Sequence, residues 1–117
     1  MDRVRSFTRR ASIGVFVALA FVLSGAAASG EEATVLISVK GKRFQPSEIR
    51  GPANRPIVLR VKNQDGAAME FESVSLRVEK VVAANSEGII RLRPLAAGRY
   101  EFFDDFNQAN RGTLVVE

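Results

Sequence analysis

Turn-forming residues divide the chain after residue 28 into short apolar runs. Glycine, proline and asparagine recur at intervals of about 8–12 residues, a spacing typical of all-β sandwiches and barrels. Hydrophobic side chains alternate within the runs, so that Ile57, Leu59 and Val61 would share one face of a strand. No segment after residue 28 has the helical period of about 3.6 residues. The pattern predicts an all-β fold, a Greek-key β-sandwich of about seven or eight strands in two antiparallel sheets.

The expected strands follow from these runs, and one of them contains a proline. They cover residues 34–40, 44–50, 57–62, 69–72, 75–82, 88–93, 99–103 and 113–117. Pro46 predicts a sheet edge or a bulge in the second strand, because proline cannot donate to the hydrogen-bond ladder. Residues 104–112 are predicted to form a loop between the last two strands. We expect Phe102, Phe103 and Phe106 to anchor the core, since aromatic side chains dominate core energetics.

The beginning of the chain has the features of a secretory signal peptide. Four arginines and one aspartate in the first ten residues precede the uncharged, apolar segment 11–25. Ala26 and Ala28 fit the small-residue positions of a cleavage site, so cleavage is predicted after Ala28. We therefore predict a helical signal peptide over residues 1–28 and a single periplasmic domain over residues 29–117.

Two other interpretations of the signal segment stay open. An uncleaved membrane anchor would need about 20 apolar residues to span a bilayer, and this run is shorter. The stretch TRRAS resembles a twin-arginine export signal, a route that exports proteins already folded. Because the segment holds four arginines and one aspartate, its removal lowers the net charge from +4 to about +1. We therefore expect no nucleic-acid partner, and membrane contact only through the export signal.

The chain contains no cysteine and no histidine. Disulfides, thiolate or imidazole metal ligands, and serine–histidine or cysteine–histidine catalysis are therefore excluded. No other spacing of residues suggests a nucleophile and its base, so we expect the protein not to be an enzyme. A small exported domain without disulfides depends on a well-packed apolar core or on a bound ligand.

Several segments together resemble the cupredoxin-like family. They are FQPSEI, IVLRVKNQDGAAMEFES, RPLAAGRYEFF and RGTLVVE, which span most of the chain after residue 28. Two stretches, EFESVSLRVEKVV and GRYEFFDDF, are similar to the EfeO-type domain of periplasmic iron-uptake proteins and to its stand-alone relatives beside iron permeases. The resemblance implies a cupredoxin-like sandwich that acts in iron uptake, with an iron permease or another periplasmic uptake component as its partner.

The resemblance also indicates where copper ligands would stand. In a blue-copper cupredoxin one histidine follows the strand ending in VKN. A cysteine, a second histidine and usually a methionine occupy the loop before the last strand. In this chain the first histidine position falls at or near Met69, the cysteine at Asp104 and the second histidine at Asn107. Since type 1 copper requires the thiolate, we expect no type 1 copper site.

Oxygen ligands are the main remaining candidates for a metal site. Glu70 and Glu72 are two residues apart and would face the same side of a strand. The resemblance implies that the turn carrying Met69 and the loop carrying Asp104 lie at one end of the sandwich. The candidate ligands are therefore Met69, Glu70, Glu72, Asp104, Asp105 and Asn107. Carboxylates suit a hard cation such as ferric iron and, less selectively, Cu(II) or Mn(II), whereas Met69 would suit Cu(I).

Each candidate ligand also has a purely structural interpretation. The glutamates of EFE fit the solvent face of a strand, the DD pair fits a turn, and Met69 fits the core. Glu79 and Glu101 are candidate ligands only through the motifs of the resemblance, and each fits better as a surface charge paired with a nearby Lys or Arg. The sequence predicts an exported metal-binding accessory of iron or copper uptake. The alternative is a metal-free interaction module whose metal site has decayed, as Asn107 at a histidine position suggests.

Overall fold

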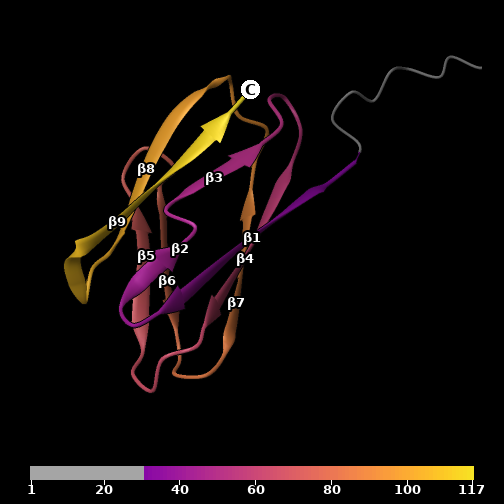
Figure 1. Cartoon of the computed structure of the whole chain (residues 1–117). Coiled ribbons are helices and arrows are strands. Elements are labelled where there is room, and N and C mark those ends of the chain that lie inside the picture. Colours follow the sequence, from indigo (N-terminus) through magenta and orange to yellow (C-terminus); the bar gives the residue numbers. More distant parts are fainter. Residues whose placement is uncertain (1–30) are drawn as a thin grey trace, which may run out of the picture.

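The computed structural model describes residues 31–117, which form two β-sheets packed as a sandwich (Figure 1). The first sheet has the order β2–β1–β4–β7, with bounds Arg43–Gln45, Ala33–Lys40, Ile57–Asn63 and Glu87–Leu92. The second sheet has the order β3–β9–β8–β5–β6, with bounds Glu48–Gly51, Asn107–Val116, Gly98–Asp104, Met69–Ser73 and Val78–Val82. The predicted signal peptide, residues 1–28, lies outside the described residues. Within residues 31–117 no helix has the length and apolar character needed to cross a membrane.

The predicted all-β sandwich is confirmed, with nine strands in the described residues rather than seven or eight. Both sheets are mixed, because β1 pairs parallel with β4 and β3 pairs parallel with β9. The prediction of purely antiparallel sheets was therefore wrong. The chain leaves the first sheet after β2, adds β3 to the second sheet and then returns for β4. A strand that rejoins its sheet after such a crossing can run parallel to its neighbour, which a tight hairpin does not allow.

The segment 44–50, predicted as one strand, is divided between the two sheets. β2 ends at Gln45, β3 begins at Glu48, and the Gln45–Pro46 peptide bond is cis. Pro46 has no N–H to donate to a ladder, so it separates the two strands instead of lying inside one. The edge position that the proline predicted is confirmed, since β2 and β3 are both edge strands.

A tight turn joins β8 to β9, in place of the loop predicted over residues 104–112. Asp104 pairs with Asn107, so that only Asp105 and Phe106 form the turn. The Asp104 side chain favours this geometry, because its Oδ1 accepts a 3.0 Å hydrogen bond from the Phe106 N–H. Phe106 is consequently 57% exposed, and the prediction that it anchors the core was wrong.

Three phenylalanines form the aromatic centre of the core. Phe71 and Phe102 stack with ring centroids 4.8 Å apart, and Phe44 meets both rings edge-on. Phe102 is therefore a core anchor, as predicted. Phe103 instead lies on the outer face of the second sheet, where the Arg111 guanidinium is 5.3 Å from its ring centroid.

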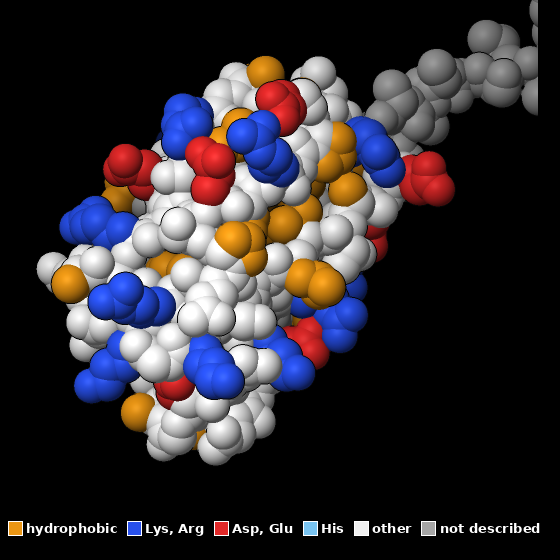
Figure 2. All heavy atoms as spheres, viewed as in Figure 1, with side chains coloured by type: hydrophobic (Ala, Val, Ile, Leu, Met, Phe, Trp, Pro, Cys, Tyr) orange, Lys and Arg blue, Asp and Glu red, His pale blue; other side chains and the backbone are white. Residues whose placement is uncertain are grey.

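Charged side chains are unevenly distributed on the surface. Figure 2 shows basic side chains over the whole visible face, mixed with acidic ones in its upper part and outnumbering them in its lower part. The ion pairs within residues 31–117 are Arg50–Glu48, Arg50–Glu117, Arg60–Glu87, Arg91–Glu32 and Arg99–Glu48. None of these pairs includes Glu70 or Glu72 of β5 or Glu79 of β6. These carboxylates therefore form no ion pair with a Lys or Arg of residues 31–117.

Candidate metal centre

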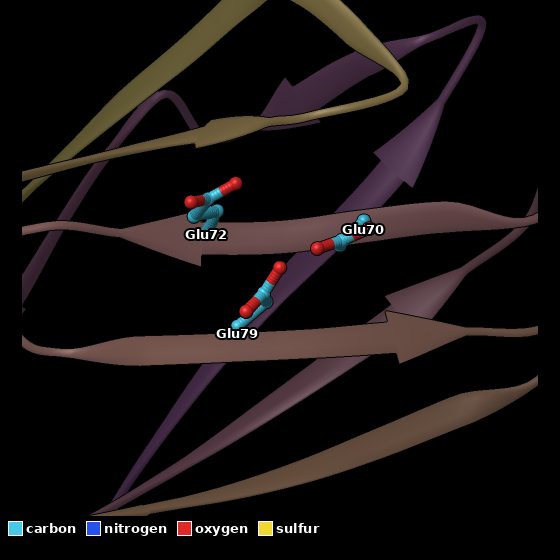
Figure 3. Close-up of side chains that lie close together, drawn as sticks. All are labelled: Glu70, Glu72 and Glu79. Carbon is cyan, nitrogen blue, oxygen red and sulfur yellow. The ribbon is translucent and has the colours of Figure 1, made fainter.

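Three carboxylates come together on the outer face of the second sheet. Met69 and Phe71 of β5 point into the core, so the alternating residues Glu70 and Glu72 point outward. The neighbouring strand β6 places Glu79 directly opposite Glu72. One oxygen from each of the three glutamates lies within 4.8 Å of the others. Figure 3 shows Glu70 and Glu79 reaching toward each other between the two strands, with Glu72 beside them.

Two hydrogen bonds to the backbone of Glu70 connect the β8–β9 turn to the same cluster. Asp104 Oδ1 accepts a hydrogen bond of 3.0 Å from the Glu70 N–H, and the Asp105 N–H donates one of 2.9 Å to the Glu70 carbonyl. These bonds hold Asp105 close enough to Glu70 and Glu72 for its charge to affect both carboxyl groups. Asp105 is therefore a fourth acid at the border of the cluster.

The glutamates of β5 titrate unusually as a result of this crowding. The pKa of Glu70 is raised from 4.5 to about 7, first by a side-chain hydrogen bond with Glu79, then by burial, and then by the charges of Glu79, Asp105 and Glu72. The pKa of Glu72 is also raised, mainly by burial and then by the charges of Asp105 and Glu79. Near neutral pH the cluster therefore holds a proton that a bound cation would replace.

Glu70 differs from an ordinary surface acid in its exposure. Although it belongs to the outer face of the sheet, it is only 8% exposed. A buried carboxylate is costly unless a positive charge compensates it. No Lys or Arg within residues 31–117 forms an ion pair with Glu70, Glu72 or Glu79. A hard cation that prefers oxygen ligands would supply this missing charge.

The other predicted ligands lie in a different place. Met69, Asp104 and Asn107 line one hollow at the end of the sandwich, where the resemblance placed the copper ligands. Met69 is 2% exposed within the core, and Asp104 Oδ1 is already engaged by the N–H groups of Glu70 and Phe106. Asn107 Nδ2 donates a hydrogen bond to the Lys42 carbonyl. The structure thus separates the six predicted residues into this hollow and the outer-face group of Glu70, Glu72 and Asp105.

The predicted ligand set left out Glu79, which was a candidate only through the motifs of the resemblance. It was expected to be a surface charge paired with Lys or Arg, but it forms no ion pair within the described residues and lies opposite Glu72. The signal that would have identified it is the hairpin register, since a β5–β6 hairpin that pairs Ser73 with Val78 also pairs Glu72 with Glu79. Glu101, also expected at the surface, is exposed on β8 outside the cluster.

Comparison with known proteins identifies the relatives of this fold. The family described as Cupredoxin-like domain matches residues 13–116. An uncharacterized protein of Rickettsia prowazekii (strain Madrid E) is 39% identical over 83 residues, which are 70% of this chain and 66% of that protein. The chain therefore spans just under two thirds of the length of this relative.

Two solved structures of copper-binding proteins have the same fold. The metal-binding domain of the Cu(I)-exporting P-type ATPase CopA of Streptococcus pneumoniae, solved with Cu(I), matches with a TM-score of 0.68 and 18% identity over 76% of this chain and 89% of that one. A copper binding protein in its apo form matches with a TM-score of 0.66 and 18% identity. The match covers 74% of this chain and 88% of that one. The family match spans most of the sequence, and the chain belongs to the cupredoxin-like domain family.

Proposed function

We propose that the protein is an exported, periplasmic metal-binding accessory of iron or copper uptake, and that it holds its ion with carboxylates rather than in a type 1 copper site. The observation that carries this proposal is the cluster of Glu70, Glu72 and Glu79, in which one oxygen of each glutamate lies within 4.8 Å of the others. The buried position of Glu70 and the lack of basic partners among the described residues favour a cation there.

The donor set decides which ions the site would take. Three carboxylates with a fourth at the border suit a hard cation such as ferric iron, and suit Mn(II) or Cu(II) with less selectivity. The chain has neither cysteine nor histidine, so it offers no thiolate or imidazole to make a copper site selective. The hollow of Met69, Asp104 and Asn107 offers a thioether and two oxygen-bearing side chains, a set that fits Cu(I) less well than thiolate sites do.

The role in uptake rests on the sequence resemblance to the EfeO-type domain and on the predicted signal peptide. In this role the protein catalyses no reaction alone and passes its ion to an iron permease or another periplasmic uptake component. An ion held by half-buried Glu72 and exposed Glu79 on one side remains accessible to such a partner. The buried Glu70 would fix the position of the ion, while the two more exposed glutamates would exchange it.

Calorimetric titration with Mn(II), Cu(II) and a weak ferric chelate tests the proposal. We expect saturable binding of at least one ion to the purified protein, and at least a tenfold weaker affinity in the double variant Glu70→Gln/Glu79→Gln. The matched control is Glu31→Gln/Glu101→Gln, which removes the same charge outside the cluster and should bind as the unmodified protein does.

Thermal unfolding separates this function from the alternative of a metal-free interaction module. An ion that binds only the folded state raises the unfolding midpoint in proportion to the logarithm of its concentration. The proposal predicts such a rise in the unmodified protein and its loss in the Glu70→Gln/Glu79→Gln variant. An unchanged midpoint with all three ions would favour the metal-free module.

A further inference from the structure

A second hollow lies at the edge where β2 of the first sheet meets the beginning of β9 of the second. It adjoins the hollow of Met69, Asp104 and Asn107 and shares Lys42 and Asn107 with it. Its volume is about 530 Å³, and three of its nine lining residues are basic. Lys42, Arg43 and Arg111 all contribute to it and are exposed. The lining contains no carboxylate among the described residues.

Asn110, which lines this hollow, is buried and carries an unused hydrogen-bond donor. It is 7% exposed, and its Oδ1 accepts a 2.9 Å hydrogen bond from the Phe44 N–H. That bond fixes the orientation of the amide group. If the amide were flipped, the Nδ2 donor would face the Phe44 N–H, which is also a donor. Nδ2 is therefore the free end, and it has no hydrogen-bond partner among the described residues. Buried donors without partners are rare in folded proteins and suggest a missing acceptor.

The three basic side chains around the hollow are not neutralised by ion pairs. The described ion pairs use Arg50, Arg60, Arg91 and Arg99 and include none of these three residues. The Asp65 carboxylate accepts hydrogen bonds from the N–H groups of Gly41 and Lys42, but it does not line the hollow. The hollow thus combines net positive charge with hydrogen-bond donors, and no carboxylate among its lining residues neutralises that charge.

We propose that this hollow binds a small oxyanion, with phosphate or carboxylate as the recognised group. Arg43 and Arg111 would bind its oxygens through charge-assisted hydrogen bonds, and guanidinium groups match both phosphate and carboxylate geometry. Lys42 adds a third charge, and Asn110 Nδ2 donates from below. Because Nδ2 is covered from solvent, the anion reaches it only when the atoms that cover it move aside.

The test is a titration of the purified, metal-free protein with inorganic phosphate and, separately, with citrate, followed by NMR chemical shifts and calorimetry. Saturable binding with shifts at Phe44 and Asn110 is expected for at least one of the two anions. Asn110→Asp keeps the acceptor for the Phe44 N–H but replaces the free donor with a carboxylate oxygen. It should weaken binding at least tenfold.

A second variant keeps the test decisive if Asn110→Asp fails to fold. Arg43→Gln/Arg111→Gln changes only exposed positions and should also weaken binding at least tenfold. The control Lys80→Gln/Arg93→Gln removes the same charge away from the hollow and should change affinity less than twofold. Absence of saturable binding, or an equal loss in the control, would overturn the proposal. Glu70→Gln/Glu79→Gln should bind the anion normally, so failure of the metal site and of the anion site are distinguishable.

Discussion

The backbone N–H of Glu70 donates a 3.0 Å hydrogen bond to Asp104 Oδ1, and the same oxygen also accepts the N–H of Phe106. One buried oxygen therefore joins β5, which carries the acidic cluster, to the β8–β9 turn. Asp104 stands where the resemblance places the copper-binding cysteine of a blue-copper protein. In this chain its observed contacts are with the backbone, so it shapes the end of the sandwich near the cluster.

Replacing Asp104 tests this structural role. Asp104→Ala leaves the N–H groups of Glu70 and Phe106 without their acceptor, and each such loss costs about 1–3 kcal/mol. Asp104→Asn keeps a side-chain oxygen at the same position, so its free energy of unfolding should fall clearly less than that of Asp104→Ala. Urea unfolding of both variants measures the difference. Equal destabilisation by alanine and asparagine would mean that the charge of Asp104, rather than its acceptor oxygen, holds the turn.

A second prediction concerns the close approach of β9 to the aromatic core. A methyl group on Gly112 would meet the Phe102 ring and would lie 2.8 Å from the Ser47 carbonyl oxygen. Neither the fully buried ring nor the backbone can move away easily, so Gly112→Ala should destabilise the protein by about 1–3 kcal/mol or more. Gly66→Ala is the matched control, because a methyl group there meets no atom within 4 Å. Chemical unfolding in which both variants lose the same stability would contradict this account of the packing.

The raised pKa of Glu70 predicts how stability depends on pH in the absence of metal. Its pKa lies at about 7 in the folded protein and near its ordinary value of 4.5 in the unfolded chain. Between these values the folded state holds the proton more tightly, so the free energy of unfolding should decrease as pH rises from about 4.5 to about 7. Because glutamine does not titrate, the free energy of unfolding should fall less over this pH range in Glu70→Gln. In Glu101→Gln it should fall as much as in the unmodified protein. Melting curves at several pH values provide the measurement, and a decrease of the same size in Glu70→Gln would exclude Glu70 as its source.

Metal binding should release a proton near neutral pH. A cation that uses the Glu70 carboxylate must displace the proton that the cluster holds, so affinity should rise between pH 6 and pH 8. Calorimetric titrations in two buffers of different ionisation enthalpy count the released protons. Fewer protons should be released on metal binding by the Glu70→Gln variant. Binding that releases no proton at pH 6.5 would place the ion away from Glu70.

Much of the fold could be predicted from the sequence because alternation is a local property. The strand at residues 57–62 was recognisable from Ile57, Leu59 and Val61, which are all buried as expected. The division of the second strand was harder to foresee. Pro46 indicated an interruption, but nothing near it specifies that β3 joins the other sheet through a parallel pairing with β9. Such pairings depend on residues far apart in the sequence.

The candidate site could be predicted only in part for the same reason. Glu70 and Glu72 belong to one strand, so their common face followed from spacing alone. Glu79 depends on the register of the β5–β6 hairpin, which brings it opposite Glu72. The small size of the β8–β9 turn depends on the Asp104 side chain, whose hydrogen bonds reach both its own turn and β5. Side-chain contacts of this kind do not leave a periodic pattern.

The central claim is that Glu70, Glu72 and Glu79 hold one metal ion. Anomalous X-ray diffraction from crystals of the protein soaked in manganese chloride tests it most directly. The account predicts one strong peak within about 2.5 Å of carboxylate oxygens from at least two of these glutamates. The peak should disappear in Glu70→Gln/Glu79→Gln and persist in Glu31→Gln/Glu101→Gln. A peak in the hollow of Met69, Asp104 and Asn107, or no ordered ion at all, would contradict the claim.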